Sequence, residues 1–189
     1  MINELYKAIK EECSNRGYLF PLAILSQAVL ECGWNFDSLL AKKYYNFFGM
    51  KCGGRWQGKS VEMNTWEEYD GAIVNIADNF RAYNSIQDGI RGYFEFINCP
   101  RYNNLKTART SAEYFTMLKS DGWATDSQYV SKLVSVHNRL LEMFKEKDSN
   151  PQYLIDFANA VIRGEYGNGL ERKERIYKAV QDTVNEILK

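Results

Sequence analysis

The chain has 189 residues, with 24 basic and 24 acidic side chains, 45% hydrophobic residues and 14% aromatic residues. This length suits one ordinary domain plus a small module, and the hydrophobic content excludes a disordered chain. The balanced charge leaves no basic surface of the kind that binds nucleic acid or an anionic membrane, so neither partner is expected.

Helical patterns dominate the sequence up to about residue 145. Apolar residues at helical spacing, with capping and turn residues between them, predict helices over residues 2–15, 21–32, 36–43, 85–97, 111–119 and 126–145. Several glycines frame a run of strand-forming residues between the third and fourth of these helices. A short β-hairpin or extended lobe is therefore predicted within residues 53–80.

Glu31 lies at the end of the second predicted helix and is the candidate general acid. Pro21 suits the first position of this helix, and Gly33 suits the position just after its end. Ile24 and Ala28 neighbour Glu31 on the helix surface, so its carboxyl group borders an apolar stripe. Apolar surroundings and the negative end of the helix dipole both disfavour the ionised carboxylate. A carboxyl group that stays protonated near neutral pH is what glycoside cleavage requires of a general acid.

The alternative is a solvated surface glutamate, which is common near helix ends. A mostly helical α+β domain with an acid at a helix end facing a small β lobe has, however, the layout of a lysozyme-like domain.

The other reactive side chains offer no competing chemistry. The four cysteines (Cys13, Cys32, Cys52 and Cys99) lack Cys-x-x-Cys spacing, which favours free thiols over a zinc site or a disulfide framework. His137 is the single histidine and lies beside an apolar stripe, so a surface or packing role is expected rather than catalysis. No metal or organic cofactor is indicated.

A charged, polar segment that ends at Pro151 marks the best domain boundary. We therefore expect a catalytic domain over residues 1–147 and a second module over residues 148–189. Within the second, helical patterns over residues 153–162 and 178–188, with a glycine turn at 167–169, predict a three-helix module.

Six sequence blocks then occur in the order and spacing of one enzyme family. They are Gln27-Ala28-Val29-Leu30-Glu31-Cys32-Gly33-Trp34, Asn46-Phe47-Phe48-Gly49-Met50-Lys51, Trp56-Gln57-Gly58, Thr65-Trp66-Glu67, Phe80-Arg81-Ala82-Tyr83-Asn84-Ser85 with Arg101-Tyr102, and Trp123-Ala124-Thr125-Asp126-Ser127-Gln128-Tyr129. With these blocks, residues 20–136 resemble the glucosaminidase family of peptidoglycan hydrolases, which includes autolysins, flagellar muramidases and phage endolysins.

The resemblance implies cleavage of the β-1,4-linked glycan strand of bacterial peptidoglycan, most often after N-acetylglucosamine, with Glu31 as proton donor. It also implies a second carboxylate in the β lobe, and Glu67 matches that position by its offset from Thr65. Glu68 competes for the role, because only one of two neighbouring strand residues points inward. The second carboxylate would activate water, stabilise the transition state or orient the substrate's N-acetyl group.

Two departures from the family pattern lie near the expected site. Trp123 replaces the usual tyrosine, which keeps an aromatic wall but removes a hydroxyl, and Tyr129 is the nearest residue to supply one. Cys32 replaces a small serine, and only a packing change is expected there. The resemblance implies substrate contacts at Asn46, Phe48, Trp56, Glu68, Tyr102, Trp123, Thr125 and Asp126.

The end of the chain resembles a different element, the short wall-binding repeat of some phage lysozymes. Its core is Gly164-Glu165-Tyr166-Gly167-Asn168-Gly169. Tyr166 would stack on a sugar, Arg163 and Arg172 would engage muropeptide carboxylates, and Asn168 belongs to the same motif. The alternative is that the glycines only shape a turn and the arginines are solvated.

The leading expectation is an endo-β-N-acetylglucosaminidase acting as a phage or prophage endolysin. The N-terminus lacks a signal-peptide pattern, so the enzyme is expected in the host cytoplasm until its release to the wall. No membrane insertion is expected, since no run reaches about 18 apolar residues. The alternatives are an N-acetylmuramidase, a lytic transglycosylase, or a non-catalytic wall-binding or phage tail protein. The oligomeric state is left open.

Overall fold

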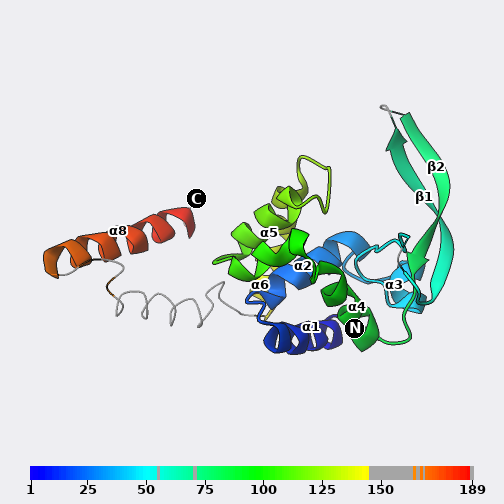
Figure 1. Cartoon of the computed structure of the whole chain (residues 1–189), viewed down its shortest axis with the longest axis horizontal. Coiled ribbons are helices and arrows are strands. Elements are labelled where there is room, and N and C mark those ends of the chain that lie inside the picture. Colours follow the sequence, from blue (N-terminus) through cyan, green and yellow to red (C-terminus); the bar gives the residue numbers. More distant parts are fainter. Residues whose placement is uncertain (55, 70–71, 145–163, 165–166, 168, 188–189) are drawn as a thin grey trace. The chain divides into compact units, whose positions relative to one another are not determined.

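The computed structural model describes residues 1–54, 56–69, 72–144, 164, 167 and 169–187, with side chains left undescribed at 65–69, 72–74 and 179–187. The chain divides into two compact units, Met1–Asp148 and Ser149–Lys189, drawn in sequence colours in Figure 1. Each unit is considered by itself.

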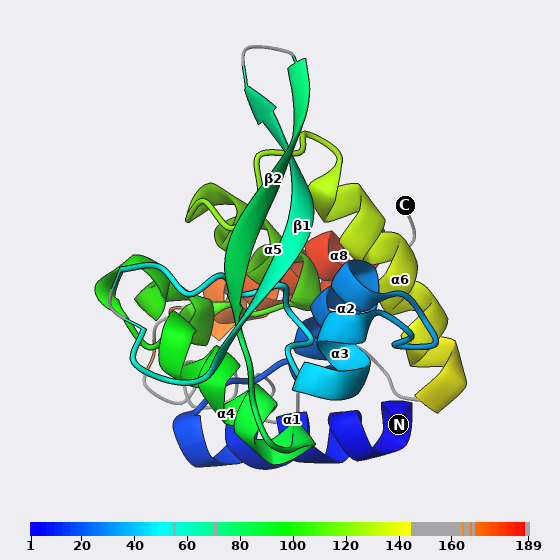
Figure 2. The same cartoon turned by 90° about the vertical axis from the view of Figure 1, so that its right-hand side faces the viewer.

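The first unit is a helical domain that carries a two-stranded sheet, and the predicted mostly helical α+β class is confirmed for it. Its elements are α1 (Ile2–Arg16), α2 (Pro21–Cys32), α3 (Leu39–Tyr44), β1 (Ser60–Tyr69), β2 (Ala72–Arg81), α4 (Ile86–Ile97), the 3₁₀ helix η1 (Pro100–Thr107), α5 (Ser111–Ser120) and α6 (Tyr129–Phe144). Figure 2 shows the hairpin projecting beyond the helices.

Helix α2 is the central element, and it contacts α1, α5 and α6. Pro21 occupies its first turn, and Gly33 follows its end with a φ of 75°. The Gly33 N–H donates to the Val29 carbonyl at 2.8 Å, which closes the last turn. Eight of the twelve residues of α2 are buried. The glutamate in its last turn, Glu31, is therefore held by a helix that is fixed on several sides.

The predicted β lobe is an antiparallel hairpin, with Ser60 opposite Arg81 and Tyr69 opposite Ala72. Its strands are longer than the predicted run of strand-forming residues. At its base, Phe80 of β2 pairs with Val61 of β1 and also forms a bridge with Lys51. The hairpin is thus joined to the loop that follows α3.

Two helix starts differ from the predicted ones. Helix α3 begins three residues later than expected, where the Ser38 hydroxyl accepts the Ala41 N–H, because Phe36 adopts a left-handed backbone with a φ of 53°. Helix α6 begins at Tyr129, after a turn in which Asp126 Oδ1 accepts the Gln128 N–H at 2.8 Å. Local side-chain capping sets both boundaries.

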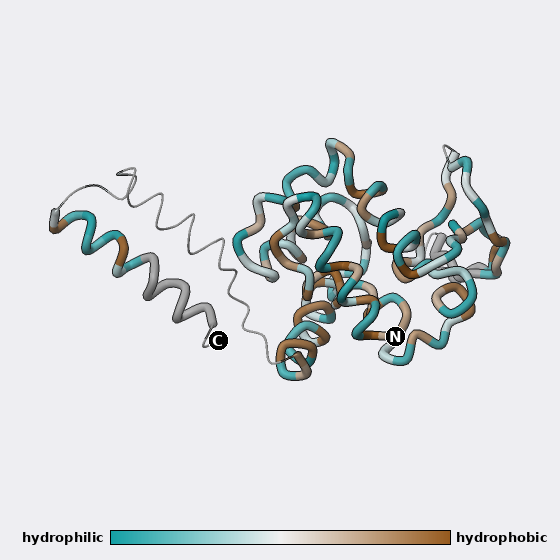
Figure 3. Tube along the Cα trace, turned by 90° about the horizontal axis from the view of Figure 1, so that it is seen from below, coloured by the Kyte–Doolittle hydropathy of each residue, from teal (hydrophilic) through white to brown (hydrophobic). Residues whose placement is uncertain are grey.

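The core joins helices through buried side chains. Figure 3 shows hydrophobic residues, in brown, alternating with hydrophilic ones, in teal, along the helices. His137 belongs to this core: it is 4% exposed, and its Nδ1 lies 3.1 Å from the Ser26 hydroxyl. This contact ties α6 to α2. The packing role that the sequence predicted for His137 is confirmed.

Gly89 allows α4 to approach the chain after α3 closely. A Cβ atom at this position would lie 2.0 Å from the Tyr45 carbonyl oxygen, which is backbone and cannot turn aside. We expect Gly89→Ala to lower the free energy of unfolding by about 1–3 kcal/mol, as overpacked positions do. Urea titration measures this loss. Gly54→Ala is the control, because a Cβ there meets no atom within 4 Å, and equal stability of the two variants would contradict the prediction.

In the second unit the structure describes helix α8 (Gly169–Ile187) and two residues before it. The helix predicted over 178–188 therefore begins earlier, at Gly169. The helix predicted over 153–162 lies outside the described residues. The predicted three-helix arrangement therefore stays a prediction. No helix in the described part of the chain is long and apolar enough to cross a membrane.

Candidate active site

Glu31 lies in the last turn of α2, and the residue is exposed to solvent. Gly49, which follows the buried Phe48, lies next to it: a Cβ atom on Gly49 would stand 4.0 Å from Glu31 Oε2. Bare backbone in a left-handed conformation, with a φ of 62°, thus borders the carboxyl group. A substrate oxygen can approach the acid without first displacing a side chain from position 49.

The pKa of Glu31 is raised, and desolvation by the surrounding protein is the main cause. Hydrogen bonds with Tyr129 and with Trp123 act in the opposite direction, because they favour the carboxylate. Desolvation prevails. A larger fraction of Glu31 is therefore protonated near neutral pH than of an ordinary glutamate, which is the state that a general acid needs.

Tyr129 is the closest polar partner of this acid. Its hydroxyl donates to Glu31 Oε1 at 3.1 Å, from the first residue of α6. Burial raises the pKa of Tyr129 strongly, and the neighbouring Glu31 raises it further. The phenol consequently remains protonated, and a hydrogen-bond donor, to higher pH than an ordinary tyrosine.

Behind Tyr129 lies a buried row of polar groups that the sequence prediction missed. Gln27 interacts with the Tyr129 hydroxyl, although its Nε2 has no hydrogen bond of full geometry among the described residues. Gln27 Oε1 accepts the Tyr93 hydroxyl at 2.7 Å, and Tyr93 lies 3.1 Å from the Tyr114 hydroxyl. Gln27 precedes Glu31 by four residues and so lies on the same helix face. That spacing was the available signal.

We expect Tyr129→Phe to lower kcat roughly tenfold or more, because hydrogen bonds to charged groups contribute about 1.5–3 kcal/mol. The Tyr129 hydrogen bond lowers the pKa of Glu31. Its removal raises that pKa, so the acid stays protonated to higher pH. The alkaline limb of the pH profile of kcat/KM should therefore move upward. A limb that stays in place or moves down would show that Tyr129 does not act on Glu31.

Trp123 connects Glu31 to an aromatic cluster. Besides its bond with Glu31, its ring lies 5.6 Å from Tyr93, 5.6 Å from Phe96 and 6.1 Å from Tyr102, measured between ring centroids. Trp123 itself is half-buried. The aromatic wall that the sequence predicted at this position is present beside the acid.

Three residues expected to contact substrate are buried, and the structure corrects that expectation. Asn46 is 0% exposed, and its amide nitrogen donates to the carbonyls of Met50 and Arg81, at 2.8 and 2.9 Å. Phe48 stacks on Tyr93 with ring centroids 3.8 Å apart, and Tyr102 is 3% exposed. These side chains support the site from behind.

The remaining predicted contacts lie at the surface. Trp56 is half-buried near the base of the hairpin, and Thr125 is exposed. Asp126 is exposed and accepts the Lys132 ammonium at 2.6 Å. That contact lowers the pKa of Asp126 and holds the carboxylate at the start of α6.

For the two candidates for the second carboxylate, Glu67 and Glu68, the structure gives only the backbone position. Glu67 and Glu68 are consecutive residues of β1, opposite Val74 and Ile73 of β2. Their side chains lie outside the described residues, so the choice between them remains the one made from the sequence.

In the second unit, Arg163, Tyr166 and Asn168 lie outside the described residues, and Arg172 Nε donates to the Gly167 carbonyl at 2.9 Å.

Cys32, next to the acid, serves packing. Its thiol donates to the Phe47 carbonyl at 3.1 Å, and burial raises its pKa to about 12. A thiol that stays protonated is a poor nucleophile. The described cysteines are free, and no group of three or more metal-binding side chains occurs among the described residues.

A carboxyl group of raised pKa at a helix end, in a helical domain that carries a small β lobe, is the arrangement expected of the general acid in a glycoside hydrolase of lysozyme-like layout. Residues 7–142 match the family model described as mannosyl-glycoprotein endo-beta-N-acetylglucosaminidase, and the chain belongs to this glucosaminidase family. Residues 156–188 match the CW_7 repeat.

Individual relatives agree with this assignment. The chain is 34% identical over 124 residues to the peptidoglycan hydrolase FlgJ of Salmonella typhimurium, covering 64% of this chain and 39% of that protein. It is 30% identical over 152 residues to the exo-glucosaminidase LytG of Bacillus subtilis, covering 77% and 52%. The chain thus spans about half the length or less of these relatives.

Among solved structures, a mutant peptidoglycan hydrolase from Sphingomonas sp. A1 superposes with a TM-score of 0.64 at 29% identity, covering 72% of this chain and 90% of that one.

Proposed function

We propose that the chain is a peptidoglycan hydrolase that cleaves the β-1,4 glycan strand, as an endo-β-N-acetylglucosaminidase. The observation that carries the proposal is Glu31, a solvent-accessible acid with a raised pKa and a hydrogen bond from Tyr129. Membership of the glucosaminidase family supports the substrate class.

In the proposed reaction, protonated Glu31 gives its proton to the bridging glycosidic oxygen as the bond from that oxygen to the anomeric carbon breaks. Tyr129 stabilises the carboxylate left on Glu31, since its hydroxyl already points at Oε1. Water then adds to the anomeric carbon and loses a proton. Glu67 would take that proton or orient the substrate's N-acetyl group, which can itself attack the anomeric carbon.

The experiment is mass spectrometry of purified peptidoglycan after digestion, with borohydride reduction to label new reducing ends. Reduced N-acetylglucosamine ends are expected. Reduced muramic acid ends would make the protein a muramidase, anhydro ends a transglycosylase, and no new ends a wall-binding protein. The LytG relative is named an exo-enzyme, so product length is read early in the digestion as well: long fragments support endo cleavage, and single disaccharides as the first products would overturn it.

We further propose that the second unit binds the wall through its CW_7 repeat. The residues that would contact the muropeptide are Arg163, Tyr166, Asn168 and Arg172. Release of the enzyme from the cytoplasm to the wall, as in an endolysin, is part of this proposal. The similarity of the repeat to that of some phage lysozymes supports it.

Deleting residues 149–189 should weaken association with insoluble wall by roughly tenfold or more, because the two sites act on one substrate and raise each other's effective concentration. Activity on small soluble fragments should fall much less. Co-sedimentation with purified walls measures the first quantity, and release of reducing ends measures the second. Equal sedimentation of the full and shortened chains would remove the wall-binding role of this unit.

A further inference from the structure

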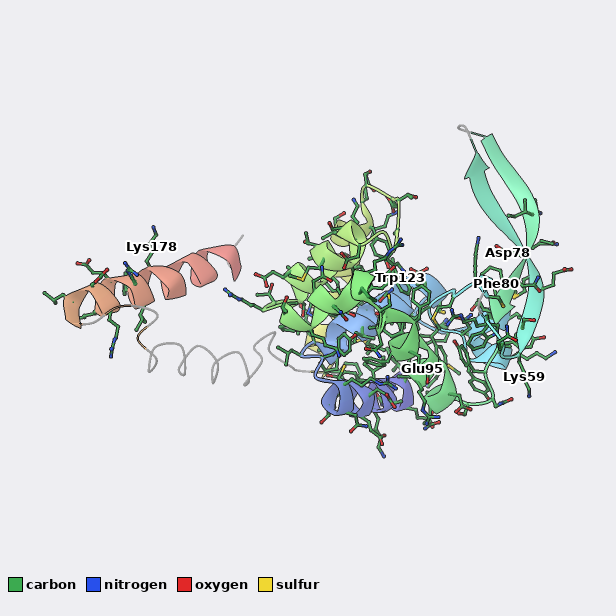
Figure 4. All side chains as sticks on the ribbon, in the orientation of Figure 1. Lys59, Asp78, Phe80, Glu95, Trp123 and Lys178 are labelled. Carbon is green, nitrogen blue, oxygen red and sulfur yellow. The ribbon has the colours of Figure 1, made fainter. Side chains whose placement is uncertain are left out.

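A pocket of about 330 Å³ lies between the start of the hairpin and helix α4, and of the substrate contacts predicted from the sequence only Trp56 lines it. Trp56, Lys59, Tyr83, Asp88, Arg91 and Glu95 supply its side-chain walls. Figure 4 labels Lys59 near the base of the hairpin and Glu95 on α4. The pocket therefore has walls from the segment before β1, from the segment between β2 and α4, and from α4 itself.

The two aromatic side chains that line this pocket, Trp56 and Tyr83, each pack directly against a glycine. A Cβ atom on Gly58 would lie 2.3 Å from the Trp56 ring, and one on Gly92 would lie 2.4 Å from the Tyr83 ring. The rings thus occupy the space that side chains at these positions would fill. Trp56 is also fixed by its Nε1–H, which donates to the Lys59 carbonyl at 2.9 Å. The pocket is formed before any ligand arrives, which lowers the cost of binding.

Two opposite charges in the pocket are not neutralised by an ion pair among the described residues. The Lys59 ammonium donates to Asn84 Oδ1 at 2.7 Å, and that amide carries no charge. Glu95 is exposed and forms no ion pair with a described residue. The other two charges, Asp88 and Arg91, face each other at 3.4 Å. Lys59 and Glu95 are thus available for a ligand that carries both a carboxylate and an ammonium group.

A chain of side-chain contacts links this pocket to the acid. Trp123, which interacts with Glu31, lies 5.6 Å from Phe96. The Arg81 guanidinium lies 5.1 Å from the Phe96 ring and 4.5 Å from the Trp56 ring. Two side chains, Phe96 and Arg81, thus separate Trp56 of the pocket from Trp123 beside Glu31. This short separation is the basis for assigning the pocket to a branch of the same substrate.

We propose that this pocket binds the peptide stem of the peptidoglycan substrate. Lys59 pairs with a stem carboxylate and Glu95 with a free amino group of the stem, while Trp56 and Tyr83 pack against its aliphatic carbons. This assignment rests on the proposed action on peptidoglycan. It makes the enzyme selective for glycan strands that still carry peptides.

The test compares kcat/KM on peptide-bearing strands with kcat/KM on strands stripped of peptide by an amidase. Wild-type protein should prefer the peptide-bearing strand. Lys59→Gln and Glu95→Gln should each reduce that ratio roughly two- to fivefold, the range expected for exposed charged contacts. Lys7→Gln and Glu142→Gln are matched controls on exposed faces of α1 and α6. An unchanged ratio in both pocket variants, or no preference in the wild type, would overturn the proposal.

Binding is also measured without cleavage, so that failure of the pocket and failure of the enzyme assignment are told apart. A disaccharide tripeptide whose third residue is a diamino acid, and the same disaccharide without peptide, are titrated calorimetrically into wild-type protein and into Glu95→Gln. A larger gain in affinity from the peptide in wild type than in Glu95→Gln supports the pocket even if no strand is cut, because the second unit is the same in both proteins. Equal binding of both ligands by wild type excludes the pocket even if strands are cut.

Discussion

Glu31→Gln is expected to lower the turnover of peptidoglycan by about 10²-fold or more, the usual contribution of general acid catalysis. Glutamine keeps the shape of the side chain and can still accept the Tyr129 hydrogen bond, but it has no proton to give to a departing sugar. Release of new reducing ends from purified walls measures the loss. Glu142→Gln, on the exposed face of α6, is the matched control.

The same variant should bind insoluble walls as the wild type does, because the proposed wall-binding unit is untouched. Hydrolysis at the wild-type rate by Glu31→Gln would remove Glu31 from the mechanism. Loss of both binding and hydrolysis would instead indicate a folding defect, which thermal unfolding would reveal.

The pH dependence of the free energy of unfolding is a second way to test the raised pKa of Glu31, and the direction of the effect is defined. Its folded-state pKa is raised, so the folded protein binds this proton more tightly than the unfolded chain does. The stability associated with protonated Glu31 is therefore present below the unfolded-state pKa and is lost as pH rises through the folded pKa. Above that pH the desolvated carboxylate destabilises the fold. Glu31→Gln should then be more stable than wild type at neutral pH, with a smaller difference in acid.

Local signals were sufficient to predict the frame of the site. Pro21 and Gly33 bound α2 within one residue of the predicted limits, because both act through their own backbone conformations. Ser85 caps α4 by accepting the Asp88 N–H, at the start of the helix predicted over residues 85–97. The placement of Glu31 at a helix end next to an apolar stripe followed from these boundaries alone. The raised pKa has the direction that this placement implied.

Family motifs, by contrast, do not tell which way a side chain faces. Asn46 and Phe48 lie in one motif with Gly49, yet only the backbone of Gly49 borders the acid, while both side chains point into the core. Asn46 has a structural task, since its amide joins the loop after α3 to the end of β2. A polar residue in a motif can thus satisfy buried backbone groups instead of binding substrate. Only tertiary packing distinguishes the two roles.

The second large effect is expected at Glu67. Glu67→Gln should lower hydrolysis by roughly 10²-fold, the scale of a general base, whereas Glu68→Gln should change it by less than about threefold. The two residues are consecutive in β1, opposite Val74 and Ile73, and neighbouring strand residues project to opposite faces of the sheet. Each variant is therefore the control for the other, with the same chemistry and the same strand.

The outcome also separates the reaction types. A lytic transglycosylase works with one acid and no attacking water, so it would tolerate both substitutions while remaining sensitive to Glu31→Gln. Loss of hydrolysis in Glu68→Gln alone would assign the role of second carboxylate to Glu68. The opposite face of the hairpin would then be the one that faces Glu31. Loss in Glu67→Gln alone would support a two-carboxylate hydrolase, because the carboxylate on β1 is then needed when water replaces the departing sugar.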